Sequence, residues 1–280
     1  LSLLFVSLSS LAVDTDLDGL SDAWELENRG NPLIADYQIS VSSNSCALDD
    51  SGVTCWRSHG TGPGVPNLNN PTQISVGRSG ICALDSTGVI CWESRGNYAP
   101  SMSNPTQVSV GANHSCALDD SGLVCWGPSF TCRYDDNDNH SCSSEGRVMD
   151  EMPNFSNPTQ VSVGSFYTCV LDDSGVVCWG IYDANGLPET PSLSNPTRVE
   201  AGYHHTCAQD DTGVVCWGYD DYGKATVPSL NNPRQITLGI NHTCALDDSG
   251  VICWGSNQFG QVDVPSLSNP YQVSAGEDHA

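Results

Sequence analysis

The stretch Cys244-Ala-Leu-Asp-Asp-Ser-Gly-Val-Ile-Cys253-Trp254-Gly255 decides the fold, because it occurs six times along the chain in diverged copies. Each copy places two cysteines nine positions apart and follows the second with tryptophan. The first cysteines are separated by 36, 34, 53, 38 and 37 residues. One insertion accounts for the long step, so the underlying period of about 36 predicts a repeat architecture. The cysteine pairs are Cys46 and Cys55, Cys82 and Cys91, Cys116 and Cys125, Cys169 and Cys178, Cys207 and Cys216, and Cys244 and Cys253.

The repeated stretch predicts a β-hairpin. Asp247-Asp-Ser-Gly250 is typical of a turn, because Asp hydrogen-bonds its own backbone and Gly accepts a positive φ. With that turn, Cys244 lies opposite Cys253 on one face, at a cross-strand separation that a disulfide can bridge. Upstream, residues 232–239 alternate apolar and polar side chains, open with Asn-Pro and close with Gly, and they recur at 104–111 and 157–164. This second stretch predicts a strand in each repeat.

The composition favours a turn-rich all-β protein. Hydrophobic residues make up 38% and charged residues 15% of the chain, with 27 Gly and 16 Pro. The formal net charge of −24 argues against binding to a nucleic acid backbone, because few Lys and Arg are present to neutralise phosphate. It suits cations, basic partners or solubility. We find no apolar stretch long enough for a transmembrane segment.

Fourteen cysteines admit two interpretations, disulfides or metal ligands. The cysteines repeat within hairpins and no CxxC motif occurs, which favours disulfides and an oxidising compartment. An insertion at 128–152 adds Cys132 and Cys142, for which we predict a seventh disulfide. The acidic and amide residues at 135–139 between them are either a second cation site or, as we favour, a solvated surface loop.

Residues 1–12 (LSLLFVSLSSLA) are typical of a truncated signal peptide, with an apolar core and small residues at its end. The alternative is a buried strand. Together with the cysteines, this segment predicts a secreted or cell-surface protein, extracellular or periplasmic.

Residues 13–34 contain the sharpest chemical motif. The run Asp14-Thr-Asp-Leu-Asp-Gly-Leu-Ser-Asp-Ala-Trp-Glu25 has the spacing of a calcium-binding loop, with oxygen ligands at positions 1, 3, 5, 9 and 12, glycine at 6 and a backbone carbonyl at 7. The alternative is an acidic start to a short helix at 21–28. The stretch resembles thrombospondin type 3-like calcium repeats of bacterial secreted proteins. We therefore predict a structural Ca²⁺ ion held by Asp14, Asp16, Asp18, Leu20, Asp22 and Glu25.

The rest of the chain, residues 35–280, resembles the regulator of chromosome condensation repeat family in its short bacterial form. The resemblance lies in His242-Thr-Cys-Ala-Leu246, Gly250-Val-Ile-Cys-Trp-Gly255, Asn257-Gln-Phe-Gly-Gln261 and Val264-Pro265. It implies a β-propeller, seven-bladed when intact, of which six full repeats and the start of a seventh are present. The register predicts a cysteine just after Ala280, so we expect a chain cut at both ends and exposed strand edges where the last blade is incomplete.

Most polar residues in the repeats have a structural interpretation. His114, His205, His242 and His279 occupy one repeat position, so we expect each on a different blade and in a structural hydrogen bond. The paired aspartates lie in hairpin turns, which argues against acid–base catalysis. The repeat tryptophans are expected to pack between blades. The sequence contains no nucleophile elbow, phosphate-binding loop or HExxH motif.

Function is expected in the segments that differ between copies, which follow each tryptophan: 57–66, 93–100, 127–153, 180–191, 218–227 and 255–264. Equivalent loops of a propeller project from one side, and Tyr beside acidic groups suits protein recognition. We predict a non-enzymatic binding protein for a protein or cell-surface ligand. The alternatives are a secreted enzyme inhibitor like the propeller-type β-lactamase inhibitors, which share the short repeat, and an extracellular hydrolase or lyase. The candidate partner-binding residues are Tyr182, Tyr219, Asp220, Tyr222 and Phe259.

Overall fold

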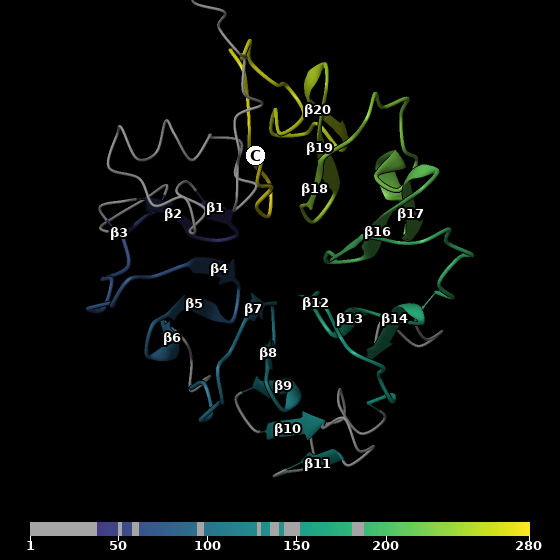
Figure 1. The fold of residues 1–280 in the computed structure, drawn as a ribbon. Helices are drawn as coiled ribbons and strands as arrows, with labels where there is room; N and C mark the ends of the chain where they lie inside the picture. Colours follow the sequence, from purple (N-terminus) through teal and green to yellow (C-terminus); the bar gives the residue numbers. More distant parts are fainter. Residues whose placement is uncertain are drawn as a thin grey trace, which may run out of the picture.

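Six antiparallel sheets surround a central opening, so the predicted β-propeller is confirmed (Figure 1). The computed structural model describes residues 38–49, 52–57, 62–93, 98–127, 130–134, 140–142, 152–180 and 188–280, and within 130–134 and 140–142 it describes the backbone alone. The predicted signal peptide, calcium loop and helix at 21–28 lie outside the described residues, as do residues 135–139 of the insertion.

Each blade has an inner, a middle and an outer strand in chain order. Blade 1 contains β1 (Gln38–Val41), β2 (Ser45–Asp49) and β3 (Gly52–Trp56), and blade 2 contains β4 (Gln73–Gly77), β5 (Gly80–Asp85) and β6 (Gly88–Trp92). Blade 3 contains β7 (Gln107–Val110), β8 (Ser115–Asp119), β9 (Gly122–Gly127), β10 (Phe130–Tyr134) and β11 (His140–Cys142). Blade 4 contains β12 (Gln160–Val163), β13 (Tyr167–Asp172) and β14 (Gly175–Gly180). Blade 5 contains β15 (Arg198–Ala201), β16 (His205–Asp210) and β17 (Gly213–Gly218), and blade 6 contains β18 (Gln235–Leu238), β19 (His242–Asp247) and β20 (Gly250–Gly255). A 3-10 helix, η1 (Asp221–Gly223), follows β17.

The repeated stretch forms the predicted hairpin in its predicted register. In blade 6, Cys244 pairs with Cys253 and Asp247 with Gly250. All six pairs within the repeats form disulfides, with Cα atoms 4.0–4.1 Å apart. In the insertion the backbone register places Cys132 opposite Cys142, whereas the side chains of that pair lie outside the description.

The first aspartate of each turn pair ties the hairpin to the start of its own blade. In blade 6, Asp247 Oδ1 accepts from the Ser249 N–H at 2.7 Å, and Oδ2 accepts from the Asn231 N–H at 2.8 Å. These bonds hold the pKa of Asp247 below its ordinary value, and the bond from the Asn231 N–H has the largest effect. The carboxylate is therefore used in turn formation, as predicted from its position.

The insertion does not form only a surface loop. Its backbone pairs as β10 and β11 along the outer edge of blade 3, giving a five-stranded sheet in the order β11-β10-β9-β8-β7. After the insertion, Met152 and Phe155 are buried, and the Phe155 ring lies 5.1 Å from that of Trp179. This extension is not predictable from the repeats, because the segment lacks the repeat pattern.

Neighbouring inner strands are joined by two hydrogen bonds from backbone N–H groups of one blade to side-chain oxygens of the blade before it, a pair of contacts that we call the latch. In blade 1, Gln38 Oε1 accepts from the Ile74 N–H of blade 2 at 2.6 Å, and Ser40 Oγ accepts from the Val76 N–H at 2.9 Å. Buried backbone donors need acceptors, and here side chains of the preceding blade supply them. The Gln-x-Ser pattern of the inner strands therefore holds neighbouring blades together.

The same two bonds, 2.6–3.1 Å long, recur at six of the seven joints around the described ring. The acceptors are Gln38 and Ser40, Gln73 and Ser75, Gln107 and Ser109, Gln160 and Ser162, Gln235 and Thr237, and Gln272 and Ser274. Residues 272–276, which we call the closing segment, take the place of a seventh inner strand and latch onto β1. Figure 1 shows this C-terminal segment between blades 6 and 1. The ring is therefore closed at the channel.

Middle strands add a second, buried set of contacts between blades. His114 Nε2 of blade 3 lies 2.7 Å from Thr168 Oγ1 of blade 4, and His205 Nε2 of blade 5 lies 2.7 Å from Thr243 Oγ1 of blade 6. Burial lowers the pKa of His114 to about 4 and that of His205 to about 3. These histidines are neutral structural groups, as their repeat position indicated.

Candidate recognition face

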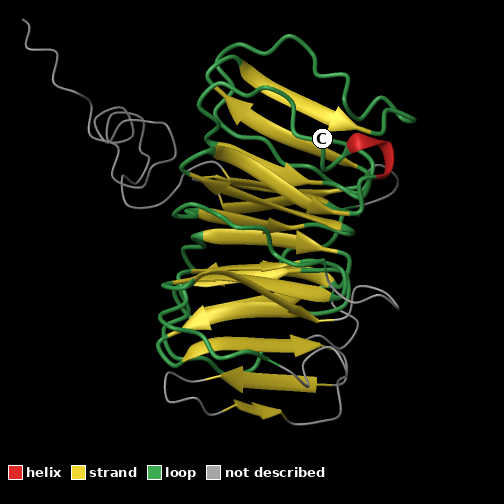
Figure 2. Ribbon diagram, turned by 90° about the vertical axis from the view of Figure 1, so that its right-hand side faces the viewer, coloured by secondary structure: helices red, strands yellow, loops and turns green. Residues whose placement is uncertain are grey.

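One end of the propeller brings together two sets of connections. Inner and outer strands of a blade run parallel, so the turns after the inner strands and the segments after the outer strands begin at the same end. In blade 5 the Tyr219 N–H donates to the His204 carbonyl at 2.9 Å, and in blade 6 the Ser256 N–H donates to the Asn241 carbonyl at 2.8 Å. We call this end the turn face; η1 lies there, at one end of the strands in Figure 2.

The glycine that ends the inner strand of blades 2 to 6 lets the turns pack closely around the channel. A Cβ at Gly111 would collide with the Gly164 carbonyl of the next blade, and a Cβ at Gly77 would collide with the Gly111 carbonyl. Each turn therefore rests directly on the backbone of its neighbour. In blade 4 the second residue after the glycine, Phe166, is exposed on this rigid support.

Aromatic side chains gather on the turn face over blades 4 to 6. The rings of Tyr203 and His204 lie 5.2 Å apart, and the rings of His204 and Tyr219 lie 6.0 Å apart, both edge to face. Tyr219 is 42% exposed and Phe166 of blade 4 is also 42% exposed. Exposed aromatic rings on a fixed support are the side chains that most often contribute binding energy at protein interfaces.

The segment after β17 presents Tyr222 at the outer edge of this face. Asp220 accepts hydrogen bonds from the Ala225 and Thr226 N–H groups at 2.6 and 3.1 Å and from the Thr226 hydroxyl at 2.6 Å. The bond from the Thr226 hydroxyl is the main reason that the pKa of Asp220 lies below its ordinary value. Asp220 thus holds the loop, while Tyr222, at a φ of 66°, is 59% exposed.

Lys224 anchors the same segment to blade 6. Its side chain is buried, and Nζ donates to the Ile240 carbonyl at 3.4 Å and to Asn241 Oδ1 at 3.2 Å. Burial lowers the pKa of Lys224. Its own carbonyl accepts from the Thr243 hydroxyl at 2.8 Å and from Trp254 Nε1 at 3.0 Å. The loop that carries Tyr219 and Tyr222 is therefore fixed at both ends.

Phe259 lies in the corresponding segment of blade 6 and is 73% exposed. Its backbone N–H donates to Gln261 Oε1 at 2.8 Å, and Asn257 Nδ2 donates to Asp263 Oδ1 at 2.8 Å across the base of the loop. The loop is therefore ordered by its own polar residues. The structure brings Tyr219, Tyr222 and Phe259 to neighbouring segments, and Tyr182 lies outside the described residues.

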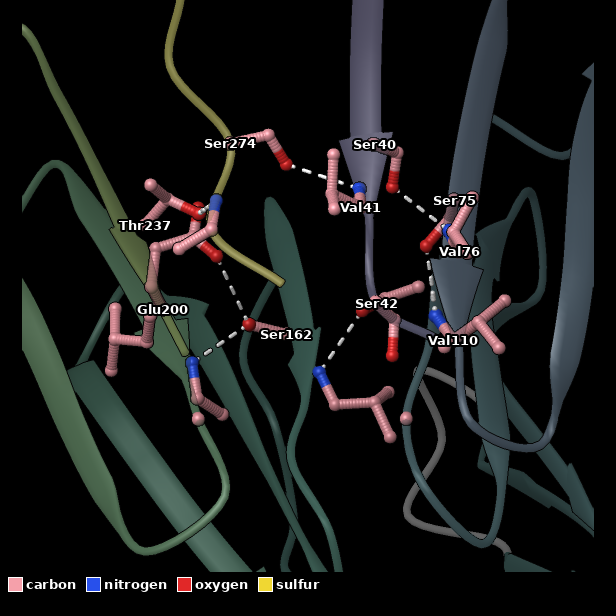
Figure 3. Close-up of a pocket in the computed structure, with 18 of the residues that line it drawn as sticks. Ser40, Val41, Ser42, Ser75, Val76, Val110, Ser162, Glu200, Thr237 and Ser274 are labelled. Carbon is pink, nitrogen blue, oxygen red and sulfur yellow. Dashed lines mark hydrogen bonds between the residues drawn. The ribbon is translucent and has the colours of Figure 1, made fainter. Parts of the chain in front are cut away.

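The channel opens onto the turn face beside this aromatic group. It contains a cavity of about 310 Å³, whose polar wall is made by the latch side chains (Figure 3). At its mouth, Arg78 of blade 2 donates to the Tyr203 hydroxyl of blade 5 at 2.5 Å, and its Nε lies 3.9 Å from Glu277 Oε1. Because blades 2 and 5 are not neighbours, Arg78 spans the mouth.

Sequence reasoning missed Arg78, Phe166, Tyr203 and His204. A signal for them exists, because the two positions after the inner-strand glycine differ between copies as strongly as the segments after tryptophan do. Within the described ranges, no group of three or more His, Cys, Asp or Glu is arranged to hold a metal ion.

Comparison with known proteins agrees with the repeated blade structure. The family model of the regulator of chromosome condensation (RCC1) repeat matches residues 106–131 and 234–261, which include the cysteine hairpins of blades 3 and 6. These hairpins are two of the six equivalent blades of one ring. The protein is an RCC1-type β-propeller.

Solved structures similar to this RCC1-type propeller include two plant receptor ectodomains. The ectodomain of the receptor kinase CR4 from Physcomitrella patens has a TM-score of 0.64 and 22% identity, covering 85% of this chain and 68% of that one. The CRINKLY WD40 ectodomain of ACR4 from Arabidopsis thaliana has a TM-score of 0.59 and 20% identity, covering 86% and 90%. Yeast RCC1 (Prp20), solved bound to Kap60, has a TM-score of 0.57 and 20% identity, covering 74% and 66%. A search of curated protein sequences gives no match.

Proposed function

We propose that this RCC1-type propeller is an extracellular, non-enzymatic recognition protein that binds a protein or cell-surface ligand on its turn face. The observation that carries the proposal is the group of exposed aromatic rings at Phe166, Tyr219, Tyr222 and Phe259 on well-supported turns and loops. Aromatic anchors on a rigid scaffold suit recognition, because few rotatable bonds are lost on binding.

An extracellular location is supported by the six disulfides, which persist in oxidising compartments. The similarity to two receptor ectodomains agrees with this location. Across the described residues, no helix has the length and apolar character needed to span a membrane.

The absence of enzymatic activity is supported by the state of the repeat side chains. His114 and His205 are buried against the next blade, and their pKa values of about 4 and about 3 leave them neutral at pH 7. Asp247 and its equivalents are used in turns. An inhibitor of a hydrolase would be one form of the proposed recognition protein, with the enzyme as its partner.

The proposal is tested by photo-crosslinking. A photoreactive phenylalanine analogue at position 259 is expected to capture a partner, and alanine at Tyr219 and Tyr222 is expected to weaken binding of that purified partner at least thirtyfold, since aromatic anchors each contribute about 2 kcal/mol or more. Tyr271→Ala is the control. Tyr271 is 47% exposed and follows Pro270, which lies at the hairpin turn of blade 6, at the opposite end. Full binding by the double variant, with loss in the control, would place recognition elsewhere.

We also propose that residues 13–34 bind a structural Ca²⁺ ion through Asp14, Asp16, Asp18, Leu20, Asp22 and Glu25. The support is the ligand spacing alone. Calorimetric titration with CaCl₂ is expected to show one site that is lost in Asp14→Asn/Glu25→Gln. An Asp120→Asn/Asp173→Asn variant, which alters exposed hairpin turns, is the control. Equal heats in all three proteins would rule out this loop.

A further inference from the structure

One joint of the ring lacks the latch. In β15 the two latch positions carry Arg198 and Glu200 in place of Gln and Ser. Arg198 Nε donates to Glu200 Oε1 at 3.1 Å, and Arg198 Nη2 lies 3.0 Å from the same oxygen. Glu200 Oε2 also accepts from the Ser162 hydroxyl of blade 4 at 3.5 Å. The two side chains therefore pair with each other and with the preceding blade, and in the described contacts neither accepts a hydrogen bond from β18. We call the space between β15 and β18 the seam.

The seam leaves two backbone donors of β18 without latch acceptors. In every other inner strand, the residues equivalent to Ile236 and Leu238 donate their N–H groups to the preceding blade, as Ile74 and Val76 do in blade 2. The strands β15 and β18 also approach each other less closely than β1 and β4 or β12 and β15 do. Ile236 and Leu238 line the channel cavity together with Arg198 and Glu200.

Contacts farther from the channel hold this joint instead. His205 contacts Thr243, Gln209 Nε2 donates to the Pro233 carbonyl at 2.6 Å, and Lys224 binds the turn of blade 6. Blades 5 and 6 are therefore joined by their middle strands and by the loop after β17. The channel wall at the seam is not needed to keep the ring closed.

The backbone donors of β18 and the charged side chains of β15 indicate which kind of ligand the seam can bind. Ile236 and Leu238 are two residues apart on one strand, so their N–H groups point in the same direction about 6.7 Å apart. Alternate carbonyls of an extended peptide have this spacing, and a free strand edge binds such a peptide by main-chain hydrogen bonds. In the wall of the same cavity, Glu200 offers acceptors and Arg198 offers donors, which suits both the N–H and the C=O groups of a peptide.

The net charge argues against a simple anion as the occupant. The chain carries −24, and Glu200 lies 3.0 Å from Arg198 in the seam. An uncharged main chain is not repelled by the negative net charge or by Glu200. The cavity of about 310 Å³ lies at the lower end of the range for ligand pockets, which suits a segment of a few residues.

We propose that the seam binds the main chain of a short extended peptide, which adds to β18 as a further strand inside the channel. This site is separate from the aromatic residues of the turn face. Its carbonyl groups accept from the Ile236 and Leu238 N–H groups, and its other edge meets Arg198 and Glu200.

The first test measures amide hydrogen exchange in the whole protein. The Ile236 and Leu238 amides are expected to exchange at least tenfold faster than the latched Ile74 and Val76 amides. Arg198→Gln/Glu200→Ser, which restores the latch pattern, is expected to remove this difference. Equal protection of all four amides in the wild type would overturn the proposal.

The second test selects peptides from a displayed library of random heptapeptides on the immobilised full chain and measures the affinity of the capped synthetic winners. Arg198→Gln/Glu200→Ser is expected to weaken binding at least tenfold. Arg57→Gln/Glu93→Ser is the matched control, because it removes an exposed ion pair of 2.8 Å with the same change in charge. Replacing alternate peptide bonds by esters is expected to weaken binding with a period of two residues.

The results of these tests distinguish peptide binding at the seam from ligand binding on the turn face. Peptides that bind the latch-restored variant as well as the wild type, or that lose affinity only in Tyr219→Ala/Tyr222→Ala, would show that the seam is not their site. Failure to select any peptide above background would also overturn the seam proposal. Crosslinking at position 259 tests the turn face in either case.

Discussion

The joint between blades 1 and 2 and the joint between blades 5 and 6 connect equivalent strands by different chemistry. At the first, Gln38 and Ser40 satisfy two backbone donors of β4 in the channel wall. At the second, Arg198 and Glu200 pair with each other in place of a latch, and His205, Gln209 and Lys224 join the two blades farther from the channel. The difference shows that ring closure and the channel wall are separable, so one joint can change its wall without opening the ring.

The largest expected effect is a loss of stability in acid at the joint between blades 5 and 6, because this joint depends on His205. The pKa of His205 is about 3 in the folded protein, against 6.5 ordinarily, chiefly through burial and secondly through Lys224. Between pH 3 and pH 6.5 the unfolded state therefore binds a proton at His205 that the folded state does not bind. The contribution of His205 to the unfolding free energy is complete above pH 6.5 and is lost as the pH falls toward 3. At about 1.36 kcal/mol per pKa unit, this dependence of the unfolding free energy on His205 amounts to roughly 5 kcal/mol.

Hydrogen exchange as a function of pH checks this expectation. Amides of β16 and β19 at the seam joint should lose protection before those of β2 and β5. His205→Gln, which does not titrate, should flatten the dependence of unfolding free energy on pH relative to wild type. A uniform loss of protection around the ring would contradict the special dependence of this joint on His205.

Removing a latch should cost more than removing the pair at the seam. Gln107→Ala/Ser109→Ala leaves the Val161 and Val163 N–H groups without their acceptors, at about 1–3 kcal/mol for each buried donor. Arg198→Ala/Glu200→Ala removes a partly exposed ion pair, which contributes about 0–1 kcal/mol. Urea denaturation of both variants measures the contrast, and equal losses would mean that the pair at the seam acts as a latch.

Restoring the latch should stabilise the protein. Arg198→Gln/Glu200→Ser supplies acceptors for the Ile236 and Leu238 N–H groups, and each net hydrogen bond contributes about 1 kcal/mol. We expect an unfolding free energy higher by about 1–2 kcal/mol, measured by urea denaturation at neutral pH. Arg57→Gln/Glu93→Ser should change it little, because that ion pair is exposed. A loss of stability in the restored variant would indicate that the seam is filled by other contacts.

The smallest expected effect concerns His242. Both of its ring nitrogens are buried without a hydrogen-bond partner, and Ala280 stands where the preceding joint has Thr243. Ala280→Thr supplies a hydroxyl at that repeat position and should add about 1 kcal/mol. Thermal unfolding checks this, with Ala280→Val as the control for β-branching. Equal shifts in the two variants would exclude the hydrogen bond as the cause.

Much of the fold followed from local sequence, whereas the seam did not. The Asp247-to-Gly250 turn fixes the hairpin register, so the pairing of Cys244 with Cys253 was predictable and is confirmed. The exposed side chains of Tyr219, Tyr222 and Phe259 were also found from sequence, since they lie where the copies differ. Arg198 and Glu200 went unnoticed because the latch they replace acts between strands more than thirty residues apart. Such a contact leaves no signal within one repeat.

Each of the six described disulfides closes a single hairpin, and its two cysteines are nine positions apart. Along the chain, blades are therefore linked covalently only by the connecting peptide, and no described crosslink bridges two blades. A protease that cuts one connection, such as 218–227, produces two fragments that stay together only through latches and buried side chains. On a non-reducing denaturing gel these fragments should separate, although every described cysteine pair is still intact.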